Sequence, residues 1–285
     1  MDFSSHVARY ASRIRGIAIF ARKGLRWTDK LKMAVIGYAR GHTFSAPGLI
    51  SFLGRSIFPD VRVKPSLLRG LTLHLNPSDM SHLVVVDEIL LEQVYPIDQV
   101  PFQPDLVVDC GANIGIFTLL AASRFPNSRL IAFEPDPMNI EWLRKHVDAN
   151  GLVVEVIEAA VSTEDGEARF EAGLGVASAF VDRERIGGSV IKVRTLQLSR
   201  FIAEVDPRRL LLKLDVEGAE DDLFPDIIHV LPRDCSVFFE THGGERSWNQ
   251  ARQLLEKAGF SVTVIRRRSI YVEAHALRIS AEMPK

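Results

Sequence analysis

The chain has 285 residues, of which 47% are hydrophobic and 25% are charged, and its net charge is −1. This composition supplies enough apolar material for one large core, or for one domain with an appendage. No apolar stretch approaches the ~20 residues that cross a bilayer, and no long apolar segment follows the first arginines, so neither a membrane span nor a secretory leader is expected. Cys110 and Cys235 lie in apolar runs and are expected to be buried thiols, which suits a cytoplasmic location.

The charges are distributed unevenly along the chain. Residues 1–70 contain 13 Lys and Arg against 3 Asp and Glu, a balance of +10, and the remainder contains 22 against 33, a balance of −11. Apolar and basic positions alternate near the start, so residues 1–58 are expected to form a basic helical extension. Two interpretations stay open: the extension contacts anionic lipid at the inner membrane surface, or its basic face docks on the acidic body. Nucleic acid is not an expected partner, because phosphate binding needs a basic face and the body around the expected site is acidic overall.

Residues 59–103 are expected to form a β-hairpin and a helix that act as a cap or lid. The stretch 60–77 alternates apolar and polar residues, as short antiparallel strands do. Residues 79–95 have helical spacing, although their run of valines is unfavourable in a helix. Three side chains of this region are candidates to reach a ligand pocket from the lid: His82, Glu92 and Tyr95.

From residue 104 to residue 285, strands and helices alternate. The expected strands are 106–109, 129–134, 153–159, 210–215, 236–241, 260–265 and 269–277. Helices are expected from about 115 and at 138–150, 219–229 and 248–258, with a loop-rich segment between 160 and 209. Short, almost wholly apolar strands separated by amphipathic helices predict an α/β fold with a doubly wound, mostly parallel seven-stranded sheet. The short last connection predicts an antiparallel C-terminal hairpin with a solvated tip at Arg266, Arg267 and Arg268.

The stretch "VVDCGANIGIFTLL" interrupts the apolar pattern where the first parallel strand ends. Asp109 closes that strand, and Gly111 and Gly115 frame the turn into the next helix. Ligands of such sheets bind at the carboxyl ends of the strands, so backbone is expected to approach a small molecule closely at this turn. A tight connection with Asn113 as a helix cap is the alternative interpretation.

Glu134 lies 25 positions after Asp109, at the end of the second strand, where an acid that binds ribose hydroxyls is expected. The dinucleotide fingerprint needs glycine at the first, third and sixth positions of the turn, which are Gly111, Asn113 and Ile116 here. Two of the three positions do not fit, which disfavours a nicotinamide-dependent oxidoreductase. A ligand with a ribose but no pyrophosphate tolerates this turn, and S-adenosylmethionine is the common ligand of that kind.

Five blocks in order, "VVDCGANIGIFTLL", "IAFEPDPMNIEWLRKHVDAN", "AAVSTEDGEARF", "LLKLDVEGAEDDL" and "FFETH", resemble the FkbM family of S-adenosylmethionine-dependent methyltransferases. The resemblance covers about 104–275 and implies a class I methyltransferase-like fold and methylation of sugar or natural-product hydroxyls. It also implies a turn against the methionine end of the cofactor, a ribose acid, and a segment against the adenine. The cofactor-binding residues that it implies are Asp109, Gly111, Ala112, Asn113, Gly115, Glu134, Pro135, Ala159, Ala160 and Asp215.

Methyl transfer from a sulfonium requires an aligned acceptor oxygen and a group that receives its proton. Candidates end the fourth and fifth strands: Asp215, Glu217 and Glu220 in "LDVEGAE", and Glu240 and His242 in "FFETHGGE". The resemblance makes Asp215 and Glu217 catalytic residues, and His242 suits a general base because imidazole titrates near neutrality. In the alternative interpretation Asp215 caps the next helix, Glu217 and Glu220 complement its positive end, and His242 is structural.

Four of these groups, Asp215, Glu217, Glu240 and His242, are ligands that a divalent ion uses, but they form no close-spaced ligand motif, so no metal is expected. The sequence therefore predicts an S-adenosylmethionine-dependent O-methyltransferase acting on a hydroxyl of a saccharide, glycolipid or secondary metabolite. The alternatives are a nicotinamide-dependent oxidoreductase and a non-catalytic binding protein with a methyltransferase fold. The sequence does not indicate an oligomeric state.

Overall fold

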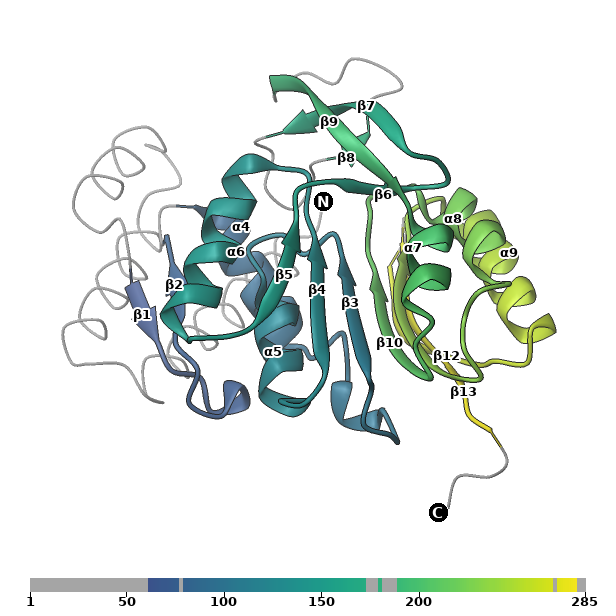
Figure 1. Cartoon of the computed structure of the whole chain (residues 1–285), viewed down its shortest axis with the longest axis horizontal. Helices are drawn as coiled ribbons and strands as arrows, with labels where there is room; N and C mark the ends of the chain where they lie inside the picture. Colours follow the sequence, from purple (N-terminus) through teal and green to yellow (C-terminus); the bar gives the residue numbers. More distant parts are fainter. Residues whose placement is uncertain (1–60, 77–78, 173–178, 181–188, 269–270, 281–285) are drawn as a thin grey trace, which may run out of the picture. The chain divides into compact units, whose positions relative to one another are not determined.

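The computed structural model describes residues 61–76, 79–172, 179–180, 189–268 and 271–280 (Figure 1). The predicted basic extension, 1–58, lies outside these residues. The chain divides into two compact units, one ending at Gln93 and including 148–150, and one that comprises 94–147 and the chain from 151 onward. The larger unit thus begins before residue 104, and the role of 59–103 as a cap or lid stays a prediction. Within the described residues, no helix combines the length and hydrophobicity that crossing a bilayer requires.

The smaller unit contains the predicted hairpin and the predicted helix. Strands β1 (Val61–Val63) and β2 (Leu73–Leu75) pair antiparallel, as expected. Helix α4 (Met80–Val86) continues as one wider turn, η2 (Asp87–Leu91), in which the N–H of Glu92 donates to the carbonyl of Asp87. The predicted helix therefore ends at Leu91 and not at residue 95.

The larger unit is built on a seven-stranded sheet with the order β12-β13-β11-β10-β3-β4-β5. Its strands are β3 (Leu106–Cys110), β4 (Arg129–Phe133), β5 (Val154–Ile157), β10 (Arg209–Leu214), β11 (Asp234–Thr241), β12 (Ser261–Arg267) and β13 (Val272–Arg278). Every strand runs parallel to β3 except β13, which pairs antiparallel with both β11 and β12. The predicted fold class is confirmed. The strand order reverses between β3 and β10, and such a switch point is where open α/β sheets bind ligands.

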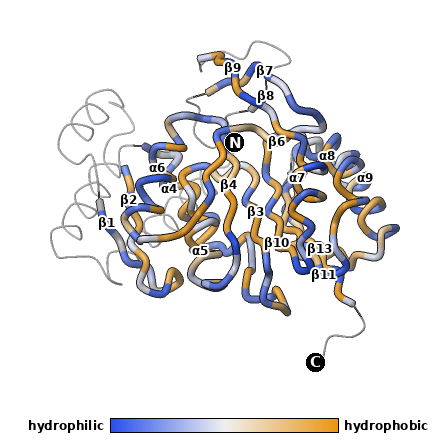
Figure 2. The backbone as a smooth tube through the Cα atoms, viewed as in Figure 1, coloured by the Kyte–Doolittle hydropathy of each residue, from blue (hydrophilic) through white to orange (hydrophobic). Residues whose placement is uncertain are grey.

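Helices cover both faces of this sheet, which explains why its central strands are mostly apolar. The helices are α5 (Ile116–Arg124), α6 (Pro137–Ala149), α7 (Leu198–Val205), α8 (Glu220–Ile227) and α9 (Gly244–Lys257). Leu106, Val108 and Cys110 of β3 pack in one core with α7, α8 and α9, whereas Asp109 points to the opposite face and to α5. In Figure 2 hydrophobic residues follow the central strands, whereas the helices contain both hydrophobic and hydrophilic residues.

The segment after β5 forms a second sheet, with the order β6-β9-β7-β8. Its strands are β6 (Ala160–Ser162), β7 (Gly166–Ala172), β8 (Ala179–Phe180) and β9 (Ser189–Gln197). The prediction of a loop-rich segment was therefore wrong for these residues. Phe170 and Val193 alternate with polar neighbours and pack together, so the period-two pattern of a half-buried sheet was present in the sequence. Figure 1 shows this sheet at the carboxyl ends of the parallel strands.

The arginines before the last connection are not simply a solvated tip. Arg266 belongs to β12 and forms an ion pair with Glu273 of β13, whose side chain is buried. A buried carboxylate requires a partner charge, and the antiparallel register places Arg266 directly opposite it. Arg267 pairs with Glu245 on the exposed surface. The prediction is thus corrected at Arg266. The two cysteines are buried free thiols, as expected.

Candidate active site

The turn between β3 and α5 takes Gly111, Asn113 and Gly115 into the left-handed region, with φ angles of 73°, 51° and 86°. A Cβ on Gly111 would lie 2.0 Å from the carbonyl oxygen of Asp215, and a Cβ on Gly115 would lie 2.4 Å from Cδ1 of Leu143. Positive φ favours glycine at both positions, and at Gly111 the backbone of Asp215 also leaves no room for a Cβ. The expectation that a ligand also approaches the backbone closely at this turn stays a prediction.

The backbone N–H groups of this turn are all engaged within the protein. Gly111 and Ala112 donate to Phe133 O, Asn113 to Glu134 Oε2, Ile114 to Asn113 Oδ1 and Gly115 to Ala112 O, over 2.7 to 3.0 Å. The turn consequently offers no ring of free N–H groups of the kind that binds phosphate. Asn113 is also not a helix cap, because the N-cap residue of α5 is Gly115 and it lacks a side-chain cap bond.

Glu134 follows β4 and ties its end to the turn after β3. Its Oε2 accepts the N–H of Asn113 at 2.7 Å, while Oε1 accepts the N–H of Asp136 at 2.9 Å and the amide of Asn139 at 3.2 Å. Burial raises the pKa of Glu134 to about 7, against the lowering effect of these bonds. Three of about four acceptor positions on the carboxylate are used, and the remaining one is on Oε2.

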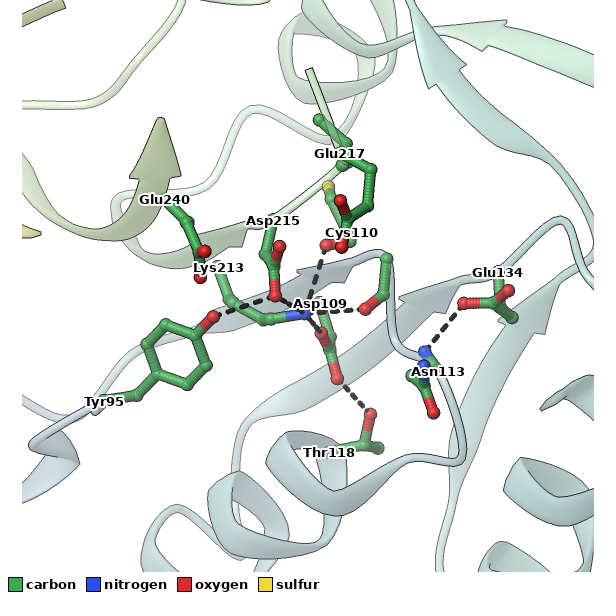
Figure 3. Close-up of polar contacts among 12 residues, drawn as sticks. Tyr95, Asp109, Cys110, Asn113, Thr118, Glu134, Lys213, Asp215, Glu217 and Glu240 are labelled. Carbon is green, nitrogen blue, oxygen red and sulfur yellow. Dashed lines mark hydrogen bonds and ion pairs between the residues drawn. The ribbon is translucent and has the colours of Figure 1, made fainter. Parts of the chain in front are cut away.

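Lys213 is the centre of the polar network at the switch point (Figure 3). Its Nζ donates to the carbonyl of Gly111 at 2.6 Å and lies 3.4 Å from Asp109 Oδ1 and 3.6 Å from Asp215 Oδ2. The other oxygen of Asp109 accepts the hydroxyl of Thr118 in α5 at 2.6 Å. We did not predict Lys213 as a site residue; the available signal was one lysine inside the apolar strand "LLLKLD".

Tyr95 joins this network, although 120 residues separate it from Asp215. Its hydroxyl donates to Asp215 Oδ2 at 3.0 Å, and its ring packs against Phe117 and Phe238. Burial, reinforced by the charge of Asp215, raises the pKa of Tyr95 well above its usual range, so the phenol keeps its proton. The structure therefore places Tyr95 at the predicted site. His82 and Glu92 belong to the smaller unit, and their reach to the pocket stays a prediction.

His242 follows β11 and lies among three carboxylates. Its Nδ1 is 3.1 Å from Glu220 Oε1, and its Nε2 is 3.3 Å from Glu240 Oε1 and 3.5 Å from Glu217 Oε2. Burial alone lowers the pKa of His242, but the hydrogen bonds to Glu220 and Glu240 and the neighbouring charges outweigh it and raise the pKa to about 12. These contacts favour the protonated ring over the neutral imidazole, and the role of His242 as general base stays a prediction.

Two carboxylates of this cluster titrate near neutrality. Burial, followed by the charge of Asp215, raises the pKa of Glu217 to about 8 and that of Glu240 to about 7. Glu220 differs, because its buried carboxylate accepts the N–H groups of Val216 and Gly218, each at 3.0 Å. Glu220 is thus structural, as the alternative interpretation holds, whereas Glu217 and Glu240 are suited to receive a proton.

Comparison with known proteins identifies the family of the chain. The family model described as the methyltransferase FkbM domain matches residues 109–262. This chain belongs to the FkbM methyltransferase family. It is 28% identical to Methyltransferase 1 of Beauveria bassiana (strain ARSEF 2860), over 71% of this chain and 91% of that one. It is 29% identical to the 31-O-demethyl-FK506 methyltransferase FkbM of Streptomyces tacrolimicus, over 66% of this chain and 85% of that one.

Among solved structures, the chain resembles a methyltransferase FkbM from Methylobacillus flagellatus KT, with 14% identity, 68% of this chain and 51% of that chain covered, and a TM-score of 0.45. The family match and the sheet order together confirm the predicted class I methyltransferase-like fold. The FkbM segment contains Asp109, Glu134, Lys213, Asp215 and the His242 cluster, whereas Tyr95 precedes it.

The cofactor residues that the FkbM resemblance implies differ in accessibility. Gly111, Asn113, Pro135 and Asp215 keep part of their surface exposed. The buried members are Asp109, Ala112, Gly115, Glu134, Ala159 and Ala160. Ala159 packs in the core of the large sheet and Ala160 in that of the second sheet, so any contact with a base would come from their backbone. The cofactor-binding assignments themselves stay predictions.

A metal site would use ligand atoms of Asp215, Glu240 and His242, which lie within 4.8 Å of one another. The carboxylates match the oxygen ligands of a hard divalent ion. The imidazolium of His242, however, already holds Glu220 and Glu240 by hydrogen bonds, so an ion would have to displace its proton.

The alternative interpretation of Asp215 as a helix cap is wrong, because the N-cap residue of α8 is Ala219.

Proposed function

We propose that this FkbM methyltransferase transfers a methyl group from S-adenosylmethionine to a hydroxyl oxygen of a saccharide, glycolipid or secondary metabolite. The observation that carries the proposal is the position of two kinds of carboxylate at one edge of the sheet. Glu134 follows β4 beside the glycine turn, and Glu217 and Glu240 lie where β10 and β11 end. An acid for ribose and an acid for the acceptor proton thus lie on either side of the switch point.

The residues at the turn fit the cofactor. Glu134 retains acceptor capacity on Oε2 for a ribose hydroxyl, and the half-buried Gly111 and Asn113 leave backbone surface for a ligand. S-adenosylmethionine, when bound, supplies an electrophilic methyl group on a sulfonium. The internally bonded N–H groups of residues 111–115 favour this ligand over a dinucleotide, whose pyrophosphate needs free donors. This disfavours the nicotinamide-dependent alternative.

Glu217 is the residue that we assign to proton removal. Its backbone is left-handed, with φ of 55°, and its side chain is 31% exposed, so an acceptor can reach it beside Asp215. A carboxylate with a pKa near the working pH accepts a hydroxyl proton more readily than an ordinary one. The imidazolium of His242 orients this carboxylate from the protein side at 3.5 Å. Such a base matches an oxygen acceptor, which has a proton to lose.

Two measurements test the proposal. We expect S-adenosylhomocysteine to raise the thermal unfolding midpoint of the whole chain and NAD to leave it unchanged. A screen of hydroxyl-bearing acceptors with methyl-labelled cofactor should then label a saccharide, glycolipid or secondary metabolite on oxygen. Protection by NAD, or methylation of nitrogen or carbon alone, would contradict the proposal. Tight cofactor binding without transfer to any acceptor would favour a non-catalytic binding protein.

A further inference from the structure

Lys213 is an unusual residue for the interior of a parallel sheet. It lies in β10 directly opposite Asp109 of β3, and only 3% of its side chain is exposed. Burial alone lowers the pKa of Lys213, but the carboxylates of Asp109 and Asp215 outweigh it and raise the pKa. The ammonium group is therefore charged at neutral pH. A buried charge needs partners, and here the partners come from both strands of the switch point.

The contacts of Lys213 link the turn after β3 to the end of β10. Its shortest contact is with the Gly111 carbonyl, at 2.6 Å, and it also lies 3.4 Å from the Cys110 carbonyl. On the β10 side it contacts Oδ2 of Asp215, the same oxygen that accepts the Tyr95 hydroxyl. Figure 3 shows the second oxygen of Asp215 without a contact to the other residues drawn.

Of the carboxylate oxygens of Asp109 and Asp215, this arrangement leaves Asp215 Oδ1 for a ligand. Asp109 is 1% exposed and bonded to Thr118, so a ligand cannot reach its carboxylate directly. Asp215 is 26% exposed, and the contacts of Lys213 and Tyr95 both use Oδ2, which leaves Oδ1. Asp109, Lys213 and Asp215 together carry a charge of −1, from two carboxylates and one ammonium. That charge complements the α-ammonium group of the ligand's amino-acid end, which also carries a carboxylate and is neutral as a whole.

We propose that Lys213 is the positioning residue for the amino-acid end of the cofactor. It holds the Gly111 carbonyl and Asp215 Oδ2 in place, so that Asp215 Oδ1 faces the α-ammonium group of the ligand. Asp109 acts through Lys213 and not by contact. This inference rests on the proposed use of S-adenosylmethionine. The inference adds Lys213, which was not among the predicted site residues. It also predicts that substitution of Lys213 affects the binding of the amino-acid end of the ligand and not that of the nucleoside.

The test compares two ligands that differ in their amino-acid end. S-adenosylhomocysteine has this end, and 5′-methylthioadenosine lacks it. Lys213→Met should lower the affinity of the full chain for S-adenosylhomocysteine at least about tenfold in calorimetry, the effect of losing one charge-assisted contact. The affinity for 5′-methylthioadenosine should stay within about twofold. The matched control is Lys192→Met, which removes an exposed lysine of β9 and should change neither affinity.

Lys213→Arg provides a second variant in case Lys213→Met does not fold. It keeps a positive charge between the carboxylates, but a wide, planar guanidinium replaces the compact ammonium that donates to the Gly111 carbonyl at 2.6 Å. We expect the same selective loss of S-adenosylhomocysteine. Equal losses for both ligands, unchanged affinities, or failure of both variants to fold would overturn the proposal and make Lys213 a residue of the fold alone. Wild-type protein that binds neither ligand would instead contradict the proposed function.

Discussion

The carboxylate of Glu134 accepts the backbone N–H of Asn113 at 2.7 Å, which joins the end of β4 to the turn after β3. The same carboxylate accepts the N–H of Asp136, just before α6. One acid thus organises two neighbouring turns at the carboxyl edge of the sheet. Its position makes it a structural link as well as a candidate for ribose binding, and its substitution should affect both properties.

Glu134→Gln is expected to destabilise the protein and to weaken cofactor binding. One oxygen becomes an amide NH₂ group, so a buried N–H of Asn113 or Asp136 loses its acceptor, at a cost of about 1–3 kcal/mol. Urea denaturation and calorimetry with S-adenosylhomocysteine measure the two effects. Glu155→Gln, at a half-exposed acid of β5 that pairs with Arg129, is the control and should cost less than about 1 kcal/mol. Equal losses in the two variants would contradict this role.

The stability of the ligand-free protein should fall as the pH rises from 5 to 8. The pKa values of Glu134, Glu217 and Glu240 are raised to about 7, 8 and 7, so in this window the folded protein binds more protons than the unfolded chain. Their stabilising contribution is complete below the ordinary glutamate value of 4.5 and is lost through pH 7 to 8. The pKa of His242 is also raised, from 6.5 to about 12, so its contribution to stability likewise falls as the pH rises. Urea unfolding at several pH values checks the slope, and a rising stability would refute it.

Glu217→Gln should abolish most of the methyl transfer while the cofactor still binds. Once an acceptor is known, we expect kcat to fall by about 10²-fold or more, the usual contribution of a general base. In the wild type kcat should rise with pH through about 8. This limb should disappear in the variant. Glu167→Gln, at an exposed acid of β7, serves as the control. A rise of kcat with pH near 7 that persists in Glu217→Gln would indicate that Glu240 removes the acceptor proton instead.

Gly111→Ala should destabilise the protein more than Gly218→Ala. Both glycines have positive φ, 73° and 108°, so both variants introduce backbone strain of about 1–3 kcal/mol. A Cβ at Gly111 would also meet the Asp215 carbonyl at 2.0 Å, whereas a Cβ at Gly218 meets nothing within 4 Å. Thermal unfolding of the two variants therefore isolates the contact between the turn and β10. Similar midpoints would show that this contact can relax.

Local patterns were sufficient to predict the strands of the large sheet and its helices except α7, which lies in the segment expected to be loop-rich. Apolar runs of strand length, separated by amphipathic helices, require a sheet buried on both faces, and parallel strands end at one edge. That reasoning correctly brought Glu134, Asp215, Glu217, Glu240 and His242 to the same edge. The second sheet was missed because β6 pairs with β9, which lies far along the chain. The alternation of apolar and polar residues within one strand does not indicate its partner.

Contacts between residues distant in sequence were decided by the tertiary structure. The raised pKa of His242 depends on Glu217 and Glu240, at the ends of two strands, and on Glu220, at the start of α8, and no local pattern reveals this cluster. Lys213 meets Asp109 because the strand order reverses beside β3 and brings β10 against it, and Tyr95 reaches Asp215 from a segment that precedes the sheet. Residue spacing specifies the periodicity of single elements, whereas the pairing of strands determines which charges share a low-dielectric interior, and that pairing sets their protonation.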